Sequence, residues 1–184
     1  LASFKERSEL VSHFKATSYD SIFANEVRQK YVTSVCRETA LPLADSLRLV
    51  GVDGSHTTLG SLLRQWENRP VYVDFWSSSC GPCLQAMPQS EALRNDGTWK
   101  GIVFLYLSMD SKDAAWKGAL RKARLEQYPY SYRVDERESA GFLTHYAIDW
   151  LPRYMLFDRG KNVFDADAPG PGQAELKELF KVVK

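Results

Sequence analysis

The stretch VYVDFWSSSCGPCLQAMP, residues 71–88, decides how the rest of the chain is interpreted. The run VYVDFW is almost continuously apolar, which is typical of a central strand that is covered on both faces. Cys80 and Cys83 follow where this strand gives way to a helix, which we expect to reach about Leu93 with a bend at Pro88. The stretch therefore predicts a strand, a short loop and a helix that begins at a pair of cysteines.

The position of Cys80 at a helix start points to thiol chemistry. A sulfur there faces unpaired backbone N–H groups and the positive end of the helix dipole, and both favour the thiolate, which is the attacking species. Cys83 lies one helical turn further along the same face, across Gly81 and Pro82, and is within reach of Cys80. We therefore expect Cys80 to attack a disulfide and Cys83 to resolve the mixed disulfide.

Asp74 is an acid inside the apolar run and has two interpretations. It is either a strand-end carboxylate that faces water, or a buried carboxyl group whose burial raises its pKa. In the second case the carboxyl group is expected to exchange protons with the Cys83 sulfur, directly or through water.

Other uses of a cysteine pair fit the sequence less well. A zinc site needs two further ligands, and a purely structural disulfide belongs in a turn-rich secreted module rather than at a strand-to-helix junction. The net charge of +1, from 24 basic and 23 acidic residues, provides no basic surface for nucleic acid, and no apolar run is long enough to span a membrane. The remaining candidate metal ligands are scattered: Cys36, His13, His56 and His145.

The chain is predicted to divide into a helical N-terminal extension, residues 1–44, and a second domain, residues 45–184. An apolar stripe with helical spacing supports the first, and alternating strands and helices predict a parallel sheet core in the second. After residue 45 we expect a strand, a tight turn at Asp53-Gly54, and a short strand or helix after the turn. Further strands are expected at 101–109 and 153–158, and a looser region at 128–134. Helices are expected at 111–127, capped by Ser111, at 138–146 and at 173–182.

The segment VDFWSSSCGPC resembles the active-site stretch of thioredoxin, with Asp74 placed six residues before Cys80. The resemblance implies a thioredoxin-like α/β fold, in which a mixed central sheet is flanked by helices. It also implies that Trp76 packs under the cysteine loop and that the Leu151–Pro152 peptide bond is cis and lies opposite the cysteines. The backbone of Leu151 would then pair with an extended substrate segment.

A closer resemblance, over about residues 45–184, is to the TlpA/ResA-like group of envelope thioredoxins of the Bacteroidetes type. The N-terminal hairpin, SMDSKDAAWKGAL and HYAIDWLPRYMLFDRGKNV carry this resemblance. It implies a location in the cell envelope, in the periplasm, although the segment itself contains no signal peptide. It also implies protein thiol or disulfide substrates, an upstream electron donor, and no cofactor beyond the Cys80–Cys83 disulfide. The first 40 residues are similar to the end of an extra domain that often precedes such modules.

The chain departs from the family pattern at the substrate face. Ser79 stands where the family usually has Trp, and Ala86 stands where the envelope group often has Glu. Arg153 replaces a small residue, and its charge is expected near Cys80, near the substrate or in solvent. Trp150 is expected either to border the substrate groove or to pack in the core. Trp116 is expected in the core.

The sequence thus predicts a thiol–disulfide oxidoreductase, with the Gly81-Pro82 pair favouring a reductase of protein disulfides. Two alternatives remain open. One is a binding module with little turnover, in which Ser79 and Arg153 serve partner recognition. The other is a thiol peroxidase, but SSSCGPC does not supply the Arg and Thr that would activate a peroxide.

Overall fold

The computed structural model describes residues 41–183, so residues 1–40 of the helical extension predicted at residues 1–44, Cys36 among them, lie outside the described part. The elements are α3 Leu41–Ala44, β1 Arg48–Gly51, β2 His56–Thr58, α4 Leu59–Gln65, β3 Val71–Trp76, α5 Gly81–Asn95, the short 3₁₀ helix η1 Gly97–Trp99, β4 Val103–Ser108, α6 Asp113–Ala119, β5 Ser131–Val134, α7 Glu136–His145, β6 Arg153–Phe157, β7 Val163–Asp165 and α8 Ala174–Val183.

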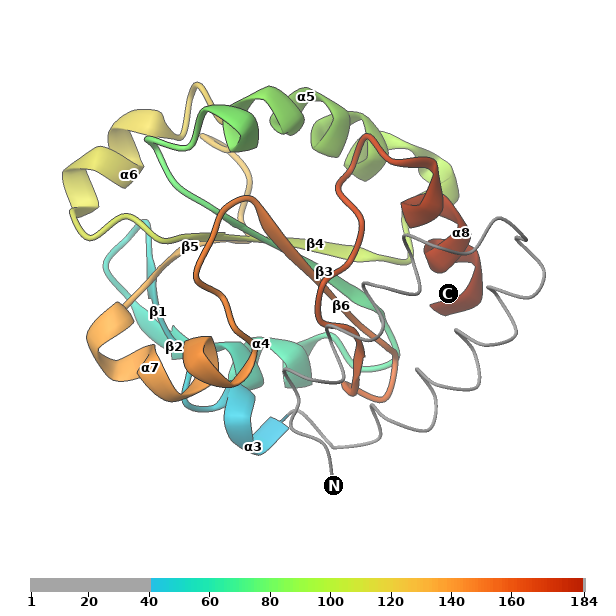
Figure 1. Cartoon of the computed structure of the whole chain (residues 1–184), viewed down its shortest axis with the longest axis horizontal. Helices are drawn as coiled ribbons and strands as arrows, with labels where there is room; N and C mark the ends of the chain where they lie inside the picture. Colours follow the sequence, from blue (N-terminus) through green and yellow to red (C-terminus); the bar gives the residue numbers. More distant parts are fainter. Residues whose placement is uncertain (1–40, 184) are drawn as a thin grey trace.

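The strands of the described residues form one seven-stranded sheet in the order β2-β1-β5-β4-β3-β6-β7 (Figure 1). The three central strands β5, β4 and β3 are parallel, as the alternation of strands and helices predicts. β1 pairs antiparallel with β5, and β6 pairs antiparallel with β3. The sheet is therefore mixed and flanked by helices, which confirms the predicted fold class.

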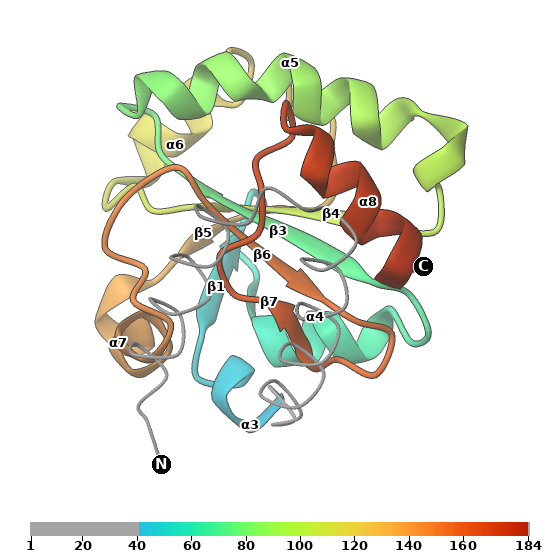
Figure 2. The ribbon, with the colours of Figure 1, turned by 45° about the vertical axis from the view of Figure 1, so that its right-hand side comes forward.

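Helices cover both faces of the sheet. Figures 1 and 2 show α5, α6 and α8 on one face and α3, α4 and α7 on the other. β3 contributes to both layers because its side chains alternate: Tyr72 and Trp76 pack under α5 and α8, whereas Val73 and Phe75 pack against α4 and α7. All six residues of β3 are buried, which explains the continuous apolar run in the sequence.

The predicted hairpin is present between β1 and β2. Gly54 has a φ of 84° and so takes a turn conformation that favours glycine, while the Asp53 side chain accepts a hydrogen bond from the Ser55 N–H at 2.9 Å. The segment after the turn is both a strand, β2, and a helix, α4. Thr58 caps α4, since its hydroxyl accepts from the Ser61 N–H at 3.0 Å.

Several local features differ from the predictions. The region at 128–134 is not loose, because it contains β5, which obtains its backbone partners from β4 and β1. The helix predicted at 111–127 ends at Ala119, and its N-cap is Lys112 rather than Ser111. The short strand β7 was not predicted, and it pairs with the end of β6.

Candidate active site

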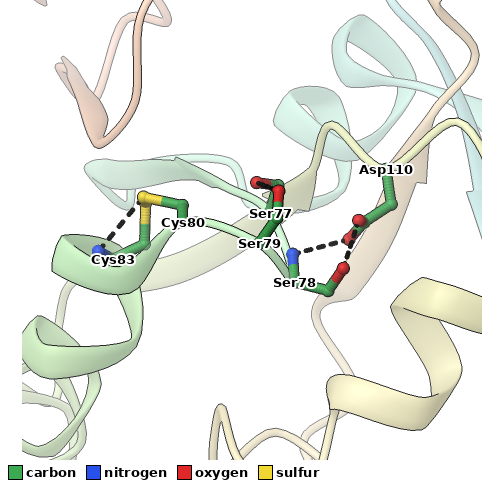
Figure 3. The surroundings of a disulfide bond; sticks show 6 residues. All are labelled: Ser77, Ser78, Ser79, Cys80, Cys83 and Asp110. Atoms are coloured by element: carbon green, nitrogen blue, oxygen red, sulfur yellow. Dashed lines mark hydrogen bonds between the residues drawn. A yellow bond between two sulfur atoms is a disulfide. The ribbon is translucent and has the colours of Figure 1, made fainter.

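Cys80 and Cys83 are joined by a disulfide at the first turn of α5 (Figure 3). Cys80 is the N-cap residue of α5, and its Sγ accepts a hydrogen bond from the Cys83 N–H at 3.2 Å. Pro82 is tolerated in this first turn because a backbone N–H is not needed there. Cys80 is half-buried, whereas Cys83 is 1% exposed. When the disulfide is reduced, this geometry favours a reachable thiolate on Cys80 and a shielded thiol on Cys83.

The loop before Cys80 is attached to the end of β4. Asp110 accepts one hydrogen bond from the Ser78 N–H at 2.9 Å and another from the Ser78 hydroxyl at 2.5 Å (Figure 3). The Ser108 hydroxyl donates a third bond to Asp110, at 2.7 Å. The Ser77 and Ser79 hydroxyls lie 3.3 Å apart on the same loop. The Asp110 carboxylate thus holds the backbone two residues before Cys80.

Asp74 lies on the face of the sheet that α5 covers. Side chains alternate along β3, so Asp74 shares a face with Trp76, which packs in the same cluster as Cys83. The strand register places Tyr106 of β4 and Tyr154 of β6 on either side of Asp74. The carboxyl group is therefore enclosed between two tyrosines beneath the helix that begins at the cysteine pair.

Asp74 is 2% exposed, which excludes the interpretation as a strand-end acid in water. Its Oδ1 atom has no hydrogen-bond partner within residues 41–183. Burial raises the pKa of Asp74 to about 8, because the charged form loses its hydration without gaining a counter-charge. Burial likewise raises the pKa of Tyr106 to about 12 and that of Tyr154 above its ordinary value. Near neutral pH, Asp74 is thus mainly protonated.

The loop around Pro152 faces the cysteine motif, and the Leu151–Pro152 peptide bond is cis, as the resemblance implies. Two open pockets flank this loop. One has a volume of about 360 Å³, and its lining includes Ser77, Ser79 and Leu151. The other, of about 460 Å³, is lined in part by Pro82 and Pro152. The two sequence motifs, 70 residues apart, therefore meet at one surface.

One of the three expectations for Arg153, a side chain in solvent, is wrong. Its side chain is 2% exposed, so it does not point into solvent. In the strand register Arg153 pairs with Phe75, so it faces away from the layer that contains Asp74 and Cys83. Its Nε and Nη2 atoms donate to the backbone carbonyls of Ala166, at 3.0 Å, and Tyr146, at 3.2 Å. The guanidinium group is therefore a buried anchor beneath the Pro152 loop.

The tryptophans fall into two groups. Trp76 is fully buried in the cluster that contains Cys83, consistent with support of the cysteine loop, and Trp116 is fully buried in the same cluster, as expected for a core residue. Trp150 is 53% exposed and lines the same pocket as Ser79, so it borders the groove rather than packing in the core.

Ala86, which stands where the envelope group often has Glu, lines the other pocket together with Pro82.

Sequence reasoning missed Asp110 as a residue of this site. A signal was available, because Ser108 and Asp110 come at the carboxyl end of β4, the strand parallel to the one that leads into Cys80. The carboxyl ends of parallel strands meet at one edge of a sheet, where sites commonly form.

Within residues 41–183, no group of three or more His, Cys, Asp or Glu side chains is arranged to hold a metal ion. No helix in the same range has the length and apolar character that crossing a membrane requires.

Comparisons with known proteins agree with this geometry. A family model described as thioredoxin-like matches residues 68–163. The thiol–disulfide oxidoreductase ResA of Bacillus thuringiensis is 24% identical over 121 residues, which cover 66% of this chain and 67% of ResA.

Solved structures from Bacteroides are also similar. One, from Bacteroides vulgatus and assigned as a thiol–disulfide oxidoreductase, is 28% identical with a TM-score of 0.62, covering 74% of this chain and 91% of that one. A thiol–disulfide oxidoreductase from Bacteroides fragilis is 25% identical with a TM-score of 0.58, covering 72% of this chain and 95% of that one. The chain belongs to the thioredoxin-like family, as a thiol–disulfide oxidoreductase of the TlpA/ResA-like kind.

Proposed function

We propose that this oxidoreductase reduces disulfides in protein substrates, with Cys80 as the nucleophile and Cys83 as the resolving cysteine. The observation that carries the proposal is the asymmetry of the pair. Cys80 is partly exposed at the start of α5 and its Sγ already accepts the Cys83 N–H, whereas Cys83 is buried. Only the sulfur that is both reachable and stabilised as a thiolate is suited to attack a substrate.

The reaction then has two balanced steps. In the first, the Cys80 thiolate attacks one sulfur of the substrate disulfide, forming a mixed disulfide and displacing the other substrate sulfur as a thiolate, which takes up a proton. In the second, the Cys83 thiolate attacks the Cys80 sulfur and displaces the remaining substrate thiolate. The substrate gains two electrons, and the protein is left with the Cys80–Cys83 disulfide described above.

Asp74 is suited to move the proton in the second step. Cys83 must lose its proton before it attacks, and it is shielded from bulk water. A carboxyl group with a pKa of about 8, on the same face of the sheet, is partly ionised near neutral pH and can accept that proton. We assign Asp74 as the general base of resolution, and as the general acid in the reverse direction.

Continued turnover needs a donor that reduces the Cys80–Cys83 disulfide again, so an upstream thiol or dithiol partner is part of the proposal. The resemblance of the Gly81-Pro82 pair to reducing thioredoxins favours the reductase direction. The resemblance to the envelope group favours a location in the cell envelope, in the periplasm.

Two measurements test this proposal. The first is the equilibrium potential of the Cys80–Cys83 pair in dithiothreitol redox buffers, which we expect near that of thioredoxin, roughly −270 mV, rather than that of a strong oxidant, roughly −120 mV. The second is insulin reduction driven by dithiothreitol, which we expect the protein to accelerate. A potential close to the oxidant value, together with no acceleration, would reverse the proposed direction.

A further inference from the structure

Trp150 is an unusually exposed aromatic residue beside the cysteine motif. Val52, Trp150 and Val182 are the large apolar side chains that stay exposed in residues 41–183. Val52 lies in the hairpin after β1 and Val182 lies on α8, whereas Trp150 directly precedes the cis Leu151–Pro152 bond. Exposure alone does not assign a role to a single apolar side chain, but the position of Trp150 in the lining of the pocket that includes Ser79 does distinguish it from Val52 and Val182.

The ring of Trp150 is held by a buried cation. The Arg153 guanidinium carbon lies 4.6 Å from the ring centroid, which is a cation–π contact. Arg153 is itself fixed by the carbonyls of Ala166 and Tyr146, and its Nε atom lies 3.5 Å from an Asp167 carboxylate oxygen. The ring is thus attached to the sheet through a rigid group, so little side-chain entropy is lost when a ligand packs on it.

The pocket that Trp150 lines starts next to the nucleophile. Ser79, the residue before Cys80, and Leu151 line the same space of about 360 Å³. When a substrate sulfur reaches Cys80, the substrate residues next to that sulfur can therefore contact Trp150.

The charge of this pocket indicates which substrate side chain binds best beside the reacting cysteine. Asp110, Glu136 and Asp149 contribute carboxylates to its lining, and none of the lining residues in the described part of the chain is Lys, Arg or His. The nearby Arg153 guanidinium is positive, but Asp167 lies 3.5 Å from its Nε atom and offsets part of that charge. The three carboxylates of the lining therefore leave a negatively charged pocket, which together with the exposed face of the ring is complementary to a long cationic side chain.

We propose that Trp150 is a specificity-determining residue that contacts a lysine or arginine side chain next to the reacting cysteine of the substrate, and that Arg153 positions its ring. This inference rests on the proposed function, since it names the substrate class of the same site.

The test is a set of disulfide-linked peptide dimers that differ only beside the cysteine, where they carry Lys, Ala or Glu. The readout is the ratio of kcat/KM for the Lys peptide to kcat/KM for the Glu peptide. Cation–π and charge contacts at a partly exposed site predict a ratio of roughly tenfold for the parent protein. Trp150→Ala should lower that ratio roughly fivefold, mostly through KM, and Trp150→Phe should keep part of it.

The other variants separate positioning from general damage. Arg153→Lys keeps the charge but loses the planar group, so the Lys-to-Glu ratio should fall as it does for Trp150→Ala, although to a smaller extent. Glu136→Gln combined with Asp149→Asn should also lower the ratio. Val182→Ala is the matched control, because it removes an exposed apolar side chain from α8 and should leave the ratio unchanged.

Two outcomes are distinguished by measuring 2-hydroxyethyl disulfide alongside the peptides. If the parent protein reduces neither this small disulfide nor any peptide, the proposed function fails and the inference fails with it. If the parent reduces all of them but shows no preference for Lys, or if Trp150→Ala keeps the parent's ratio, only the inference is overturned.

Discussion

The carboxylate of Asp110 holds Ser78 by both its backbone N–H and its hydroxyl, at 2.9 and 2.5 Å. Met109 strengthens the same junction, since its N–H donates to the Trp76 carbonyl at 2.8 Å. The end of β4 therefore fixes the loop that carries Cys80 to the start of α5. Three small serines form this loop, so hydrogen bonds rather than side-chain packing determine its conformation.

Removing this attachment should destabilise the protein. Asp110→Ala leaves the Ser78 N–H and the Ser78 and Ser108 hydroxyls without their acceptor, which we expect to cost about 2–4 kcal/mol of unfolding free energy. Ser78→Ala removes one of these bonds and should cost about 1 kcal/mol. Denaturant unfolding of the oxidised protein measures both. Asp149→Ala, at an exposed acid of the same pocket, is the control and should stay within about 0.5 kcal/mol of the parent. An Asp110→Ala variant as stable as this control would contradict the account.

The buried Asp74 carboxyl should make stability depend on pH. The unfolded chain releases this proton near the ordinary pKa of 3.8, but the folded protein keeps it up to a pKa of about 8. The folded state thus binds more protons in this window, so stability falls as pH rises from about 4 to about 8 and then levels off. The total loss is about 6 kcal/mol at most.

Asp74→Asn removes the titrating group and should remove this component of the pH dependence. The variant should resemble the parent near pH 4 and become progressively more stable than the parent up to about pH 8. Urea unfolding of both oxidised proteins at one-unit pH intervals measures the difference. A difference that does not change with pH would show that Asp74 is already ionised in the folded protein.

Arg153 should be important for stability as well as for the substrate groove. Arg153→Met leaves the carbonyls of Tyr146 and Ala166 without their donor in a buried place, so we expect a loss of about 2–4 kcal/mol. Arg137→Met on the exposed surface of α7 is the matched control and should change stability by less than about 0.5 kcal/mol. Thermal unfolding of the two variants compares them directly, and equal melting temperatures would contradict the anchoring role.

The parts of the fold that the sequence predicts well are those with a strong local signal. β3 has a continuous apolar run, α5 starts at a CGPC motif and contains Pro88, and the hairpin contains an Asp53-Gly54 turn. β5 lacks such a signal, since Tyr132 and Arg133 are only half-buried and the strand is four residues long. Its structure comes from the backbone partners that β4 and β1 provide, and these are remote in sequence.

The same distinction holds at the site. Cys80, Cys83 and Asp74 lie within one short stretch, so their spacing on a strand and a helix is readable from the sequence. Asp110 lies outside that stretch, and its position after a parallel strand was the signal for it. Arg153 is different, because it depends on partners that only the folded chain brings near. The buried guanidinium of Arg153 is possible because the backbone carbonyls of Tyr146 and Ala166 accept its hydrogen bonds, and no local pattern reveals those acceptors.

Asp74 should also affect the second chemical step. In the Asp74→Asn variant no carboxylate is available to accept the Cys83 proton, so resolution of a preformed mixed disulfide should be slower by roughly a hundredfold or more, as for loss of a general base. The rate should also depend less on pH between 5 and 9 than it does in the parent. Stopped-flow measurement of thiol release across this range is the test. A profile that superimposes on the parent profile would remove Asp74 from proton transfer.

The central claim is that Cys80 attacks the substrate and Cys83 resolves the intermediate. The most direct test incubates the Cys83→Ser and Cys80→Ser variants with insulin whose disulfides are intact, and identifies the linked residues by mass spectrometry. We predict that Cys83→Ser accumulates a mixed disulfide at Cys80 and that Cys80→Ser accumulates none, because Cys83 is buried. Trapping through Cys83 in the Cys80→Ser variant, with none through Cys80 in the other, would contradict the account.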